Sequence, residues 1–104
     1  MNQPPREYVR VTYDALHAFL AKAGRAAGMS AEGSAFLAGV LATNEARGVW
    51  SHGAMQIAAY AGLMRAKKLN PTPVPTVARE TAASVLVDGD GGLGYFAAHE
   101  ATRR

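Results

Sequence analysis

A helix–loop–helix corner is predicted around the stretch Arg47-Gly48-Val49-Trp50-Ser51-His52-Gly53. This stretch lies between two helix-like segments and places a guanidinium, a hydroxyl and an imidazole within seven residues. Ser51 is expected to cap the helix that follows, because a serine oxygen accepts a hydrogen bond from an unpaired N–H of the first turn. The free N–H groups and partial positive charge of a helix start suit a carboxylate or a phosphate. The stretch therefore predicts a small anion-binding corner beside a titratable group.

A purely structural interpretation of the same stretch stays open. Arg47 can close the preceding helix by hydrogen bonding to its last carbonyl groups, and Trp50 can act as a packing anchor. The stretch is then a capped corner without a ligand. Helix caps are common and binding sites are few, so chemistry alone weighs the two interpretations about equally.

Length and composition indicate one small globular domain. The chain has 104 residues, which is short for a complete cofactor-dependent enzyme, and 49% of them are hydrophobic. The absence of cysteine excludes a disulfide framework and thiolate metal sites. The net charge of +3 comes from basic residues spread along the chain, which argues only weakly for nucleic acid.

Residues 1–10 are expected to form a flexible arm. They are polar, contain two prolines and lack the apolar centre of a secretory signal. No apolar run in the sequence is long enough to span a bilayer, and we expect a cytoplasmic location.

Three helices are predicted over residues 11–70. The first follows its N-cap Thr12 and ends at Gly28, and the second follows the N-cap Ser30 and covers residues 31–46. The third is expected to begin after Ser51 and to run to about Lys68, with Lys67-Lys68 in its last turn. Apolar residues at helical spacing mark the inner faces: Leu16, Phe19, Leu20 and Ala23; Phe36, Leu37, Val40 and Leu41; and Ile57, Tyr60, Ala61 and Met64.

Residues 71–104 predict a change of structure. A proline-rich connector leads to two β-prone runs, residues 76–80 and 84–88, which are expected to form a hairpin. A glycine turn over residues 89–94 precedes a further helix that is expected to begin at Tyr95 and to run to the last residue. The predicted fold class is therefore α+β, with a three-helix segment followed by a β-hairpin and the start of another helix.

The glycine turn also spells G-x-G-x-x-G through Gly89, Gly91 and Gly94, after a strand and before a helix. That context fits a dinucleotide fingerprint. Against it, the strand is better explained as half of a hairpin, and the acidic residue expected about 20 positions later lies beyond Arg104. The alternative is a glycine turn that needs positive φ.

Other catalytic arrangements find less support. Adjacent residues at a helix start point in different directions, so His52 is expected to be badly placed to activate Ser51, and no G-x-S-x-G elbow is present. His17, His52 and His99 are scattered without paired ligand spacing, so no metal site is predicted.

The sequence resembles the N-terminal part of the malate/L-lactate dehydrogenase family, the NAD(P)-dependent family without a Rossmann fold. The resemblance rests on Glu45-Ala46-Arg47-Gly48-Val49-Trp50-Ser51-His52-Gly53, then Tyr60, then Leu69-Asn70-Pro71, and on the turn from Val87-Asp88-Gly89 to Gly94. It covers residues 11–104, and residues 71–104 would be the beginning of an α/β cofactor or substrate domain.

The resemblance implies reversible hydride transfer between NAD or NADP and a 2-hydroxy or 2-oxo acid. The catalytic roles fall on His52 and Ser51, and substrate-binding roles on Ser51, His52, Gln56 and Arg47; no cofactor-binding residue is assigned. The resemblance also implies a homodimer. Family members are considerably longer, so the 104 residues alone are expected to lack turnover.

Two positions depart from the family pattern. Trp50 stands where the family usually has Asp, and Gln56 stands where it usually has an Arg that pairs with the substrate carboxylate. Gln lacks that charge, and the loss of a charge-assisted contact costs about 1.5–3 kcal/mol.

Two alternatives to an enzyme segment remain. Three helices with a positive charge could form a helix-turn-helix nucleic-acid binder, although the basic residues do not cluster on one helix. The chain could instead act as a dimerisation or lid element whose apolar faces are left uncovered when it stands alone.

Overall fold

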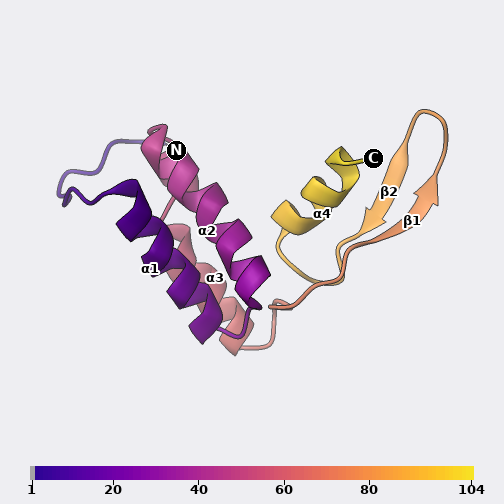
Figure 1. The fold of residues 1–104 in the computed structure, drawn as a ribbon, viewed down its shortest axis with the longest axis horizontal. Coiled ribbons are helices and arrows are strands. Elements are labelled where there is room, and N and C mark those ends of the chain that lie inside the picture. Colours follow the sequence, from indigo (N-terminus) through magenta and orange to yellow (C-terminus); the bar gives the residue numbers. More distant parts are fainter. Residues whose placement is uncertain (1) are drawn as a thin grey trace.

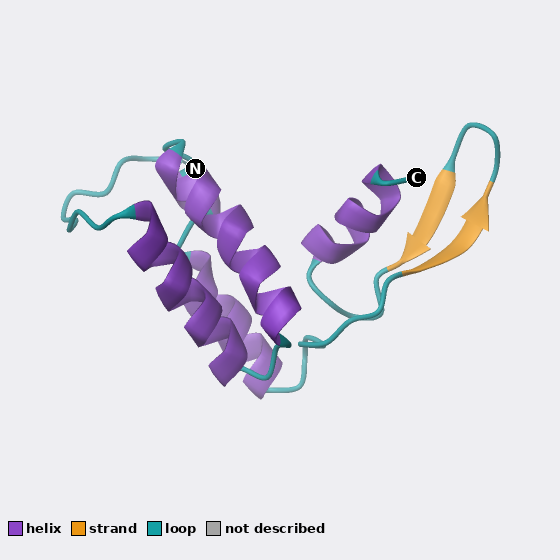
Figure 2. Ribbon diagram, in the orientation of Figure 1, coloured by secondary structure: helices purple, strands orange, loops and turns teal. Residues whose placement is uncertain are grey.

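The computed structural model describes residues 2–104 and contains two groups of elements (Figure 1). The first group is helical: α1 (Tyr13–Ala26), α2 (Ala31–Ala46), the short 3₁₀ turn η1 (Trp50–His52) and α3 (Gln56–Arg65). The second contains β1 (Thr76–Glu80), β2 (Val85–Asp88) and α4 (Gly94–Thr102). Figure 2 shows the three longer helices side by side, with the hairpin and α4 extending away from them. The predicted α+β fold class is confirmed.

The predicted ends of the first two helices are confirmed. The Thr12 hydroxyl oxygen accepts a hydrogen bond from the Ala15 N–H at 3.1 Å, and the Ser30 hydroxyl oxygen accepts one from Gly33 at 3.0 Å. Gly28 lies just past α1 with φ +107°, a left-handed conformation that stops the helix at little steric cost.

The core lies between α1, α2 and α3. Its fully buried side chains include Leu20, Leu37 and Leu41, and small residues let the helices approach closely. One predicted core residue is wrong: Phe19 is 61% exposed, because it faces the N-terminal arm rather than α2 and α3.

The third helix starts later than predicted. It begins at Gln56, because Trp50–His52 forms a separate turn and Gly53 has an extended backbone (φ −104°, ψ −144°) that breaks the helical path. Ser51 is therefore not its N-cap, and Met55, which holds that position, makes no side-chain cap. The helix ends at Arg65, and Lys67 turns the chain with φ +60°, so Lys67-Lys68 lie outside its last turn.

The predicted hairpin is confirmed, with β2 beginning at Val85. The strands pair antiparallel, from Thr76 opposite Asp88 to Glu80 opposite Val85, with an irregularity between Val77 and Arg79. Because β2 pairs with β1 in this way, the glycine turn that follows does not belong to a parallel βαβ unit. The dinucleotide interpretation of Gly89, Gly91 and Gly94 therefore has no support in residues 2–104.

A polar staple closes the base of the hairpin. The Asn70 N–H donates to the Gly91 carbonyl at 2.9 Å, and the Asn70 amide donates to the Asp90 carbonyl and carboxylate. The same carboxylate accepts from the Val74 N–H at 3.0 Å. Asp90 and Gly91 both have positive φ, so the turn follows the path expected of a glycine-rich loop.

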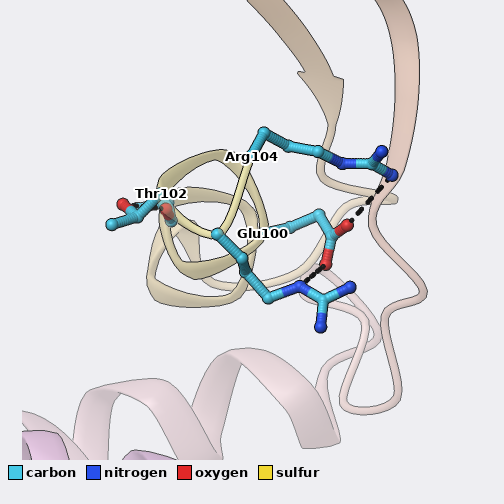
Figure 3. A network of polar contacts seen from close by, with 5 residues as sticks. Glu100, Thr102 and Arg104 are labelled. Carbon is cyan, nitrogen blue, oxygen red and sulfur yellow. Dashed lines mark hydrogen bonds and ion pairs between the residues drawn. The ribbon is translucent and has the colours of Figure 1, made fainter.

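Helix α4 joins the hairpin to the helical group. Phe96 packs against Phe36 of α2 with tilted rings whose centroids lie 5.2 Å apart, and Leu93 is buried in the core. The helix ends at Thr102 rather than at the last residue. Figure 3 shows Glu100 between two arginine side chains; its carboxylate pairs with Arg103 at 3.1 Å and Arg104 at 3.4 Å. Such exposed pairs add little to stability.

Across residues 2–104, every helix is too short or too polar to span a lipid bilayer.

The contact between α1 and α2 is expected to tolerate nothing larger than glycine at position 24. A Cβ there would lie 2.9 Å from the Ser34 Cβ and 3.1 Å from the Met29 sulfur. Over-packing of this kind costs about 1–3 kcal/mol, so Gly24→Ala should lower the free energy of unfolding measured in urea. Gly62→Ala is the matched control, because no atom lies within 4 Å of that position. It should raise stability by up to about 1 kcal/mol through helix propensity, and equal effects of the two changes would contradict the packing argument.

Candidate functional site

The candidate site is the η1 turn and the residues that hold it. Within the turn, the His52 N–H donates to the Val49 carbonyl at 3.2 Å and the Gly53 N–H to the Trp50 carbonyl at 3.3 Å. The carbonyls of Ser51 and His52 accept instead from side chains: the Gln56 amide at 2.7 Å and the Asn44 amide at 2.9 Å. The turn therefore depends on α2 and α3 for part of its hydrogen bonding.

Ser51 and His52 meet side chain to side chain. The Ser51 Oγ lies 2.8 Å from His52 Nδ1, so the expectation that the two side chains point apart is wrong. The reason is the backbone conformation, because the residues lie in a 3₁₀ turn rather than at the start of an α-helix. Ser51 is half-buried and His52 is exposed, which leaves the other ring nitrogen toward solvent. No acidic side chain bonds to His52 in the described part of the chain, so the third member of a hydrolase triad is missing.

The four residues with predicted site roles are only partly brought together. Hydrogen bonds connect Ser51, His52 and Gln56. Arg47 is exposed and follows α2 as its C-cap, where its backbone N–H donates to the Thr43 carbonyl at 3.0 Å. No hydrogen bond or ion pair of its guanidinium occurs within residues 2–104, so the structure neither joins it to the Ser–His pair nor uses it to close the helix.

The expected free N–H groups at the helix start are occupied. The Ala54 N–H donates to the Glu45 carboxylate at 3.1 Å, and those of Gln56 and Ile57 donate to the carbonyls of Gly53 and Ala54. Gly53 is buried against Glu45: a Cβ there would lie 3.0 Å from the nearer carboxylate oxygen. These groups stabilise the corner itself and leave the Ser–His side chains as its accessible polar groups.

Three supporting residues were missed by the sequence analysis. Asn2 binds the stretch twice, accepting from the Ser51 N–H at 3.0 Å and donating to the Gly48 carbonyl at 2.9 Å. Asn44 and Glu45 lie in the last turn of α2. The sequence could have indicated Asn44 and Glu45, because they are polar residues directly before the Arg47–Gly53 stretch. Nothing in the sequence pattern singles out Asn2, which lies in the arm expected to be flexible.

Trp50 faces the arm rather than the Ser–His pair. It lines an open, mostly apolar cavity of about 940 Å³ between the arm, α1 and the end of α2. Tyr8, Phe19 and Ala46 line the same cavity. This agrees with the interpretation of Trp50 as a packing residue, and it explains why an aromatic side chain is accommodated there.

Tyr60 connects the site's helix to α4. Its hydroxyl lies 3.1 Å from that of Tyr95, and the rings meet edge to face at 6.3 Å. Burial, followed by the hydrogen bond and charge repulsion from Tyr95, raises the Tyr60 pKa from 10.0 to about 12.

No three His, Cys, Asp or Glu side chains gather into a possible metal site among the residues described.

Solved structures similar to this chain include two malate dehydrogenases and a reductase. Malate dehydrogenase from Pyrococcus horikoshii OT3 superimposes with a TM-score of 0.86 and 29% identity, over 95% of this chain and 28% of that one. A delta1-piperideine-2-carboxylate reductase from Pseudomonas syringae gives 0.82 and 28%, over 92% and 29%. Malate dehydrogenase from Entamoeba histolytica, at 24% identity over 86% and 25%, shares the fold with a TM-score of 0.78.

The sequence pattern of the malate/L-lactate dehydrogenase family matches residues 11–104, and the chain belongs to that family. The curated malate dehydrogenase of Pyrococcus horikoshii is 30% identical over 96 residues, which are 92% of this chain and 27% of that protein. The chain thus spans about a quarter of the length of the relatives it matches.

The Tyr60 phenol is expected to ionise near pH 12 in the folded chain. Because its folded pKa is raised, its contribution to stability is complete below pH 10 and is lost as the pH rises through 12. Tyr95→Phe should lower the Tyr60 pKa toward its ordinary value without reaching it, because burial remains. The pKa of Tyr60 is measured from the tyrosinate absorbance as the pH rises. The Tyr60→Phe variant, which lacks this transition, identifies it, and circular dichroism confirms that the chain is still folded. Tyr8→Phe in the exposed arm should leave the transition in place; a Tyr60 transition near 10 would contradict the assignment.

Proposed function

We propose that this chain is the substrate-holding part of an oxidoreductase that transfers hydride between NAD or NADP and a 2-hydroxy or 2-oxo acid. Family membership and likeness to a malate dehydrogenase and a reductase support this reaction class. The observation that carries the proposal is the Ser51–His52 pair, held in a defined turn with an exposed imidazole.

His52 is the proposed acid–base group. Since Ser51 occupies Nδ1, the ring presents Nε2 to a ligand. An imidazole there can donate a hydrogen bond to the C2 oxygen of a 2-oxo acid, give it a proton on reduction, and take one back on oxidation. The Ser51 hydroxyl can donate to a bare Nδ1 and accept from a protonated one, so the pair remains bonded in each protonation state.

The nicotinamide supplies or accepts the hydride. The glycine turn does not form a Rossmann dinucleotide site, because it belongs to an antiparallel hairpin and its backbone bonds to Asn70. We propose that most of the cofactor site comes from segments outside these residues, and we expect no turnover from the 104 residues alone.

Carboxylate binding in this chain is proposed to be weaker than in relatives with Arg at position 56. Gln56 brings no charge and already donates to the Ser51 carbonyl. Arg47 is the cationic residue nearest in sequence to the Ser51–His52 pair. It retains a proposed substrate-binding role because it belongs to the Arg47–Gly53 stretch. A homodimer and a cytoplasmic location complete the proposal.

A packing role is the second candidate. Tyr8 and Val9 of the arm and Phe19 of α1 are 66%, 86% and 61% exposed, and all three line the cavity between the arm and α1. An apolar surface of this kind is typical of a covered interface. Self-association of the isolated chain in sedimentation experiments would favour this role; a clean monomer would argue against it.

Grafting this chain into the Pyrococcus horikoshii enzyme, in place of the matching segment, tests the proposed reaction. The folded chimera should oxidise NADH with pyruvate, oxaloacetate or glyoxylate, and His52→Gln should lower turnover about 10²–10⁴-fold. Lys22→Gln, on an exposed part of α1, is the matched control and should leave turnover unchanged.

Two outcomes would count against the proposal. A folded chimera without activity on any of these acids would remove the reaction class. Full activity of His52→Gln would remove the acid–base role of His52 while leaving the class intact.

A further inference from the structure

The carbonyl groups of the η1 turn show an uneven division of hydrogen bonds. Those of Val49 and Trp50 accept from backbone N–H groups within the turn. The next two, from Ser51 and His52, accept only from side chains among the residues described. A three-residue turn cannot supply donors for its own last carbonyls, so they need partners from outside it.

Two amides from different helices fill this need. Gln56 Nε2, at the start of α3, lies 2.7 Å from the Ser51 oxygen, and Asn44 Nδ2, near the end of α2, lies 2.9 Å from the His52 oxygen. At these distances the amide NH₂ must face the carbonyl, because two oxygens would repel. Both amides are neutral donors, so they bind the carbonyls without adding a charge beside the imidazole.

We propose that Asn44 and Gln56 are positioning residues for the Ser51–His52 pair, and that Gln56 here serves the turn rather than the substrate carboxylate. By holding the backbone of both residues, the two amides set the side-chain vectors that bring Ser51 Oγ to 2.8 Å from His52 Nδ1. That the Ser51–His52 pair acts on a substrate rests on the proposed function. That the two amides position the pair rests on geometry alone.

The position of Gln56 supports this division of roles. Gln56 is half-buried and bonds back across five residues to Ser51, so one of its two amide N–H donors is used before any ligand arrives. Asn44 is joined to the same corner a second way, since its own carbonyl accepts from the Val49 N–H at 2.8 Å. The end of α2 is thereby fixed to both sides of the turn.

Long-range ¹H–¹⁵N spectra of the imidazoles test the proposal on the full chain, at a pH where the ring is neutral. His52→Gln assigns the resonances among the three histidines, and Ser51→Ala gives the His52 spectrum without the Ser–His bond. Gln56→Met and Asn44→Ala remove a donor without adding charge, and each should move the His52 Nδ1 resonance most of the way to the Ser51→Ala position. Gln56→Arg keeps a donor, so the His52 Nδ1 resonance should stay nearer to its wild-type position than to its position in Ser51→Ala, apart from the shift caused by the added charge.

The control separates positioning from loss of stability. Asn70→Ala removes bonds of the same kind at the hairpin, so it should lower the melting temperature and leave the His52 spectrum unchanged. An unchanged His52 spectrum in folded Gln56→Met and Asn44→Ala would overturn the proposal. If either variant fails to fold, Gln56→Leu and Asn44→Leu, which also remove the donor without adding charge, replace them under the same criterion. Because the spectra need no substrate, this result is independent of whether the chimera turns over a 2-oxo acid.

Discussion

The site depends on carbonyl oxygens that their own turn cannot satisfy. Ending a helical turn at His52 leaves two backbone acceptors without backbone donors. The hydrogen bond to the Ser51 carbonyl is part-buried and that to the His52 carbonyl is exposed, so each contributes about 0.5–1.5 kcal/mol. Asn44 and Gln56 meet that requirement from the helices on either side. The same bonds hold the backbone of the only Ser–His pair in the sequence, so one constraint both closes the corner and orients the Ser51 and His52 side chains.

The second half of the chain is held to the first by a small number of specific contacts. The Asn70–Asp90 staple closes the hairpin at its base, and Tyr60 and Phe36 bind α4 through Tyr95 and Phe96. A two-stranded hairpin is marginal without cover, and α4 supplies it on one face. In the longer relatives, about three quarters of the chain lies outside the matched segment.

Membership of the malate/L-lactate dehydrogenase family gives the two departures a physical meaning. Trp50 is accommodated because it turns toward the arm and the apolar cavity, away from the Ser–His pair. Gln56 replaces a cation with a neutral donor whose partner is a backbone carbonyl. The Trp50 change alters packing, whereas the Gln56 change alters the charge next to the Ser51–His52 pair.

Local signals in the sequence determined the helix caps at Thr12 and Ser30, the stop at Gly28, the extent of α2 and the strand β1, because each depends on residues within one turn or strand. The start of α3 and the meeting of Ser51 with His52 were decided by tertiary structure. They depend on Asn2, Asn44 and Glu45, which reach the turn from the arm and the end of α2. Periodicity reports which face of a helix is apolar, but it does not report which distant side chain will bond to a particular carbonyl, and that choice requires the folded chain.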